Sequence, residues 1–109
     1  MDENVRRVAK ARLAFALAHS DDANKRMESR SIATDLVTLP DAVETDYELC
    51  FAIHRSHGED GVARKILYDA LKRFDCLSHT FVQKAYTFAT ETGDVEIRRT
   101  LDALEVAEQ

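Results

Sequence analysis

Cysteine and histidine side chains gather in the middle of the chain at spacings that would suit a metal site or a nucleophile. Cys50, His54 and His57 stand at i, i+4 and i+7, so one helix face would carry all three. Cys76 and His79 follow as C-x2-H. Two thiolates and two imidazoles can close a tetrahedral zinc site. The candidate ligands are Cys50, His54, Cys76 and His79, with His57 as the alternative to His54.

The spacing also allows a purely structural interpretation, which we prefer. C-x3-H on a helix is not the spacing of a zinc knuckle, and a helical chain of 109 residues needs no metal to fold. Cysteine is often buried as a small hydrophobe. His57, next to Gly58, would complement the dipole at a helix C-terminus. We therefore expect core cysteines, half-exposed histidines and neither metal nor cofactor.

A thiol–imidazole nucleophile is the other chemistry that this stretch suggests. Residues 48–54, ELCFAIH, resemble the active helix of the carboxymuconolactone decarboxylase and alkylhydroperoxidase family, which carries C-x2-C and a histidine four residues later. Cys50 and His54 match the second cysteine and the histidine, but Tyr47 holds the first cysteine position, which excludes disulfide chemistry between the pair. The sequence also has no phosphate-binding glycine loop, no G-x-S-x-G and no H-E-x-x-H. We expect no catalytic residues and no enzyme.

The segments that must position these side chains are helical. Three glycines and one proline are too few for an all-β fold. Apolar residues recur at helical spacing, and glycine or capping residues separate the helical segments. The sequence predicts a compact all-α bundle of five or six antiparallel helices with short connections, in a single domain of residues 1–109, without an internal repeat.

The first predicted helix, in residues 2–19, has unusual apolar content. An inner stripe is expected at helical spacing: Val5, Val8, Ala9, Leu13, Ala16 and Leu17. Residues 13–18, LAFALA, are apolar on every side, which places them in the middle of the fold or in an interface. We expect self-association, as a dimer, through Leu13, Phe15 and Leu17.

Charge is unevenly distributed along the chain, whose net charge is −5. Residues 31–60 carry seven acids and one base, Arg55. This segment is either a solvated face or a surface that meets a basic partner, as in an inhibitor that imitates nucleic acid. The residues of this predicted acidic face are Asp35, Asp41, Glu44, Asp46 and Glu48.

A helix-turn-helix is the main alternative function. The predicted helices 59–73 and 78–91 are joined by a short turn, and the second would present Ser, Thr and Gln side chains to a DNA groove. The candidate DNA-binding residues are Ser78, His79, Thr80, Gln83 and Lys84. The chain lacks a basic footprint, which disfavours nucleic acid as the partner.

By exclusion, the sequence favours a small regulatory or adaptor protein that acts by protein–protein contact. No signal peptide and no membrane segment are visible, and two cysteines form no disulfide framework. We therefore expect a cytoplasmic protein with a protein partner and no membrane contact.

Overall fold

The computed structural model describes residues 3–40, 42–74 and 77–108, and these form six helices and no strand. The predicted all-α class is confirmed. No helix in these ranges has both the length and the apolar content to cross a bilayer. The helices are α1 (Glu3–Ala18), α2 (Ala23–Thr38), α3 (Glu44–Ser56), α4 (Asp60–Arg73), α5 (His79–Thr92) and α6 (Val95–Glu108).

Several helix ends follow the predicted local rules. Gly58 and Gly93 have φ of 76° and 70°, left-handed conformations that other residues adopt at a cost. Ser78 accepts a hydrogen bond from Phe81 N, and Asp94 accepts one from Ile97 N, as N-caps do. These caps explain why α3, α5 and α6 begin or end where they do.

The start of α3 depends on the side chain of Asp46. The helix begins at Glu44, and the carboxylate of Asp46 accepts a hydrogen bond of 3.0 Å from Val43 N. Asp46 therefore caps the first turn. The second helix, α2, is continuous from Ala23 to Thr38.

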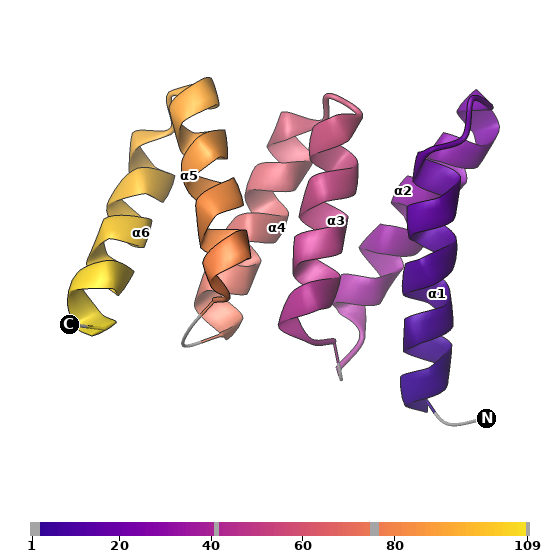
Figure 1. Ribbon diagram of the computed structural model, residues 1–109, viewed down its shortest axis with the longest axis horizontal. Coiled ribbons are helices and arrows are strands. Elements are labelled where there is room, and N and C mark those ends of the chain that lie inside the picture. The colour runs from indigo at the N-terminus through magenta and orange to yellow at the C-terminus, as the bar shows by residue number, and fades with distance from the viewer. Residues whose placement is uncertain (1–2, 41, 75–76, 109) are drawn as a thin grey trace. The chain divides into compact units, whose positions relative to one another are not determined.

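Contacts within the chain group into two units, Met1–Leu67 and Tyr68–Gln109, with the boundary inside α4. The single domain of residues 1–109 stays a prediction. In the first unit, α1 and α2 form an antiparallel hairpin and α3 packs against both (Figure 1). Small residues allow α1 and α2 to lie close together. Ala14 and Ala33 are fully buried, and Ser29 Oγ donates a hydrogen bond of 2.6 Å to the Ala14 carbonyl.

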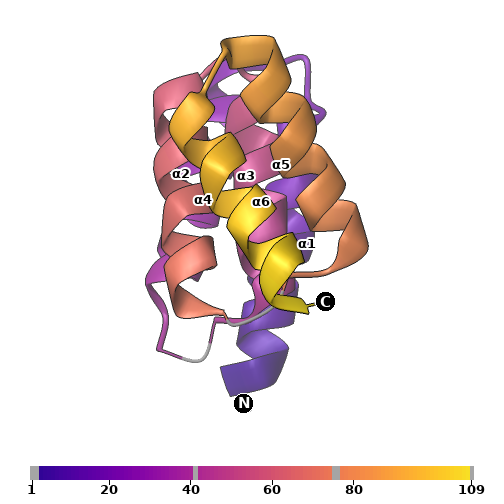
Figure 2. The ribbon, with the colours of Figure 1, turned by 90° about the vertical axis from the view of Figure 1, so that its left-hand side faces the viewer.

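The second unit contains the end of α4 and the hairpin of α5 and α6 (Figure 2). Its buried side chains lie at helical spacing, because each helix turns one face to the other. They include Phe81, Ala85, Phe88, Ile97 and Leu101.

Burial recurs along the chain with a period that the sequence prediction missed. Inward-facing positions of α2, α4 and α6 are 34 residues apart, and those of α1, α3 and α5 are 36 and 35 apart. The side chain changes type at every one of these recurrences except that from Leu67 to Leu101, so sequence identity does not reveal the period. The equivalent sets are Ser29, Ala63 and Ile97; Ala33, Leu67 and Leu101; Leu36, Ala70 and Leu104; and Ala14, Cys50 and Ala85.

Candidate functional site

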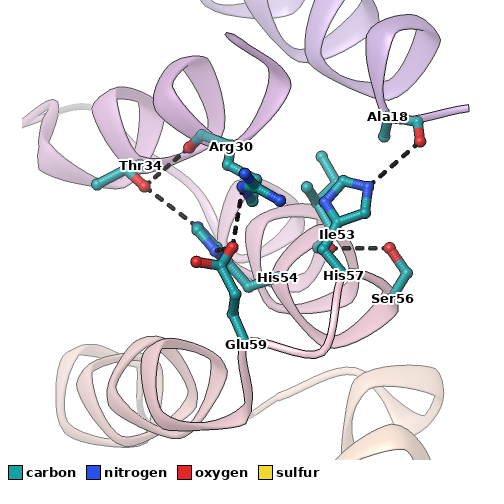
Figure 3. Close-up of polar contacts among 8 residues, drawn as sticks. All are labelled: Ala18, Arg30, Thr34, Ile53, His54, Ser56, His57 and Glu59. Carbon is teal, nitrogen blue, oxygen red and sulfur yellow. Dashed lines mark hydrogen bonds and ion pairs between the residues drawn. The ribbon is translucent and has the colours of Figure 1, made fainter. Parts of the chain in front are cut away.

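A closed ring of polar contacts surrounds His54 inside the first unit (Figure 3). His54 is 4% exposed. Its Nδ1 lies 3.2 Å from Glu59 Oε1, and its Nε2 lies 3.2 Å from Thr34 Oγ1. Arg30 closes the ring twice: its Nε lies 3.0 Å from Glu59 Oε1, and its carbonyl accepts a hydrogen bond from Thr34 Oγ1. The ring joins α2 to α3 and to the turn before α4.

The ring has the acid–imidazole–hydroxyl order of a catalytic triad, but it lacks what a triad needs to react. Thr34 donates its single hydroxyl proton to the Arg30 carbonyl, so His54 has no proton to remove from it. Thr34 also lies inside α2, where the backbone N–H groups are used by the helix and cannot form an oxyanion hole. Both ring nitrogens of His54 are engaged, one by Glu59 Oε1 and the other by Thr34 Oγ1. The contacts of the ring link α2, α3 and the turn before α4.

His57 adds a second link at the same end of α3. Its Nε2 lies 3.4 Å from the carbonyl of Ala18, the last residue of α1. Its Nδ1 is buried without a hydrogen-bond partner in the described part of the chain. His57 and His54 together tie the end of α3 to α1 and α2.

The predicted metal ligands are not brought together within the described residues, where no group of three or more such side chains could hold an ion. Cys50 is fully buried, and burial raises the pKa of its thiol to about 12. This thiol stays protonated at neutral pH and is neither a nucleophile nor a ready ligand. His54 is occupied by Glu59 and Thr34, His79 is exposed, and Cys76 lies outside the described residues.

The first helix turns the opposite face inward from the one predicted. The side that packs on the unit carries Arg7 and three alanines, Ala11, Ala14 and Ala18, of which Ala14 is fully buried. The predicted inner stripe is wrong: Val5, Val8, Ala9, Leu13 and Ala16 are all exposed, and Leu17 is half-buried. Alanines occupy the packed face of α1 because α2 lies too close to α1 for larger side chains.

We call the exposed row Val5, Val8, Ala9, Arg12 and Phe15 the outer stripe. Val5 is 51% and Phe15 56% exposed. An open hollow of about 450 Å³ lies over its first part and is lined by Val5, Val8, Ala9 and Arg12. The ring of Phe15 lies edge-on to His19, with centroids 4.7 Å apart, at the end of the helix.

The predicted self-association residues do not share one face of α1. Positions two apart in an α-helix differ by about 200° around the axis. Phe15 therefore projects away from both Leu13 and Leu17, and one flat contact cannot cover all three. Leu13 is 48% exposed and Leu17 is half-buried.

The predicted acidic face loses Asp46. Asp46 is 2% exposed and forms an ion pair of 3.0 Å with Arg7 while it caps Val43 N. Its use by a partner is therefore excluded. Asp35 is exposed, Glu44 and Glu48 are half-buried, and Asp41 lies outside the described residues.

The candidate DNA-binding residues surround the first turn of α5. Ser78 is its N-cap, and His79, Thr80, Gln83 and Lys84 are exposed. The sequence analysis predicts all five of these residues as candidates, but it does not predict the partners of His54. The only signal for Glu59 was its position one residue after Gly58, which reverses the chain beside His54.

No family model, curated protein or solved structure matches this chain.

Proposed function

We propose that the protein is a small cytoplasmic regulatory or adaptor protein that acts by contact with another protein. The observation that carries this proposal is the inverted first helix, with alanines inside and Val5, Val8 and Phe15 outside. Burying one such side chain is worth about 1.5–3 kcal/mol. An exposed apolar row of this kind on one helix marks an interaction surface.

The ring of polar contacts around His54 does not favour an enzyme over the proposed contact protein. His54 is buried, and Arg30, Thr34 and Glu59 occupy its surroundings. The alternative that the protein is an inhibitor with an acidic binding face is weakened, because Asp46 forms its ion pair with Arg7 inside the unit.

A capture experiment tests the proposal. Tagged protein is incubated with lysate of its native host, beside Phe15→Ser and the matched variant Met27→Ser, which changes a 60% exposed side chain on α2. We expect specific proteins to be retained by the parent and by Met27→Ser and to be lost with Phe15→Ser. Equal capture by all three, or no capture, would remove α1 as the contact surface.

Self-association and DNA binding remain separate proposals with their own tests. Light scattering of Leu13→Glu beside the parent tests a dimer that forms through the Leu13 side of α1. Equal masses above the monomer value would exclude Leu13 as a dimer contact. A gel shift with genomic fragments at two salt concentrations tests the DNA alternative. A shift that Lys84→Glu abolishes would favour the helix-turn-helix interpretation.

A further inference from the structure

We propose that the outer stripe docks one acidic amphipathic helix of a partner protein, laid along α1. This inference rests on the proposed function and names the chemistry of the partner. Its evidence is the shape of the stripe, the charges beside it and the charges elsewhere in the same unit.

The stripe has the geometry of a helix-binding ridge. Its members stand at i, i+3, i+4, i+7 and i+10, so they form one continuous row. The row is about 15 Å long at 1.5 Å per residue. Such rows pack against the grooves of another helix. The described residues offer no strand edge that an extended peptide could join.

The charges beside the stripe select an acidic partner. Arg6, Lys10 and Arg12 are exposed, and none has an ion-pair partner among the described residues. Residues 5–18 contain no acid at all. The fourth base, Arg7, is held by Asp46 on the packed side. Arg12 lies within the outer stripe, Arg6 lies about 60° around the helix axis from Ala9, and Lys10 projects to the other side of α1. A partner helix with Glu or Asp beside its apolar face would therefore meet Arg12 and, at one edge of the stripe, Arg6.

The same charges disfavour two other occupants. A second copy of α1 would bring bases against bases with no acid in residues 5–18 to relieve them. An anionic membrane would be attracted to α1 but repelled by residues 31–60 of the same unit, which carry seven acids and one base. An acidic helix is narrow enough to meet α1 alone.

A peptide titration tests the inference. The probe is a fluorescent amphipathic peptide of about 18 residues, five helical turns, with leucines on one face and glutamates beside them. Its twin carries lysine for every glutamate. Anisotropy is measured with the full chain at low and high salt, and phosphatidylserine vesicles and light scattering test the other occupants.

We expect salt-sensitive binding of the acidic peptide and much weaker binding of its basic twin. Arg12→Glu and Phe15→Ser should each weaken binding about tenfold. The matched variants Lys25→Glu and Met27→Ser, both on exposed positions of α2, should change it by less than about twofold.

Equal affinity for both peptides, or no binding of the acidic one, would overturn the inference. So would vesicle binding or a doubled mass that Arg12→Glu abolishes. If host proteins are still captured in a Phe15-dependent manner while the acidic peptide fails, the proposed function stands and only the partner chemistry is wrong.

Discussion

Two regions of the first unit break the rule that polar groups lie outside and apolar groups inside, and they break it in opposite ways. Between its helices, Ser29, Asp46 and His54 are buried. On α1, Val5 and Phe15 are more than half exposed. Each buried polar side chain has a partner at 2.6–3.2 Å, whereas the outer stripe leaves its apolar surface in solvent.

The difference separates stability from function. A buried polar group destabilises the fold unless its hydrogen bonds are made, so Ser29, Asp46 and His54 each fix one helix against another. A contiguous row of exposed apolar side chains contributes little to folding, and the row on α1 is the surface that we propose for a partner.

Asp46→Ala should give the largest loss. It leaves Arg7 without its carboxylate, since the side chain of Arg7 is only 12% exposed, and it removes the cap on Val43 N. We expect the free energy of unfolding in urea to fall by about 3 kcal/mol. Asp35→Ala, on an exposed acid of α2, is the control and should stay within about 0.5 kcal/mol. Equal losses would mean that burial does not distinguish the two acids.

His54→Ala should cost about 2 kcal/mol in the same assay, because it leaves a cavity and opens the ring through Thr34 and Glu59. His79→Ala, at an exposed position, is the matched control. If both variants unfold like the parent, the ring does not hold α2 and α3 together.

Ser29→Ala should cost about 1 kcal/mol, the usual value of one buried hydrogen bond. The bond lost is the one that Ser29 Oγ donates to the Ala14 carbonyl. Ser31→Ala removes an exposed hydroxyl two residues further along α2 and should have almost no effect. A neutral Ser29→Ala would show that close packing alone joins α1 to α2.

Cys50 provides the pH-dependent test. Its folded pKa of about 12 exceeds the unfolded value of about 8.5, so the folded state keeps a proton that the unfolded state releases. This contribution to stability is complete below about pH 8.5 and declines as the pH rises toward 12. In a Cys76→Ser background, the decline should be shallower in Cys50→Ala than in the parent. An identical slope, or labelling of Cys50 by a thiol reagent faster than global unfolding, would contradict its burial.

The sequence was sufficient to predict that the chain is helical, but it was not sufficient to predict which face each helix buries. Gly58, Gly93 and Ser78 determine helix ends through local backbone geometry, so they were predictable. On α1, six apolar residues at helical spacing are typical of a core face, and nothing local shows that α2 comes close enough to require alanine.

The candidate sites were less predictable because their partners lie far apart in the sequence. Arg7 and Asp46 are 39 positions apart, and Thr34 and His54 are 20 apart. Histidine, cysteine and acid spacing therefore suggested a metal site and an acidic face, whereas folding pairs Asp46 with a base and His54 with a hydroxyl and a carboxylate.

The most direct test of the central claim, that the chain's own fold does not use the outer stripe, is urea unfolding of the triple variant Val5→Ser, Val8→Ser, Phe15→Ser. The three side chains are exposed, so the free energy of unfolding should stay within about 1 kcal/mol of the parent value. A loss of about 4 kcal/mol or more, the scale of three buried apolar side chains, would place the stripe inside the fold and contradict the account.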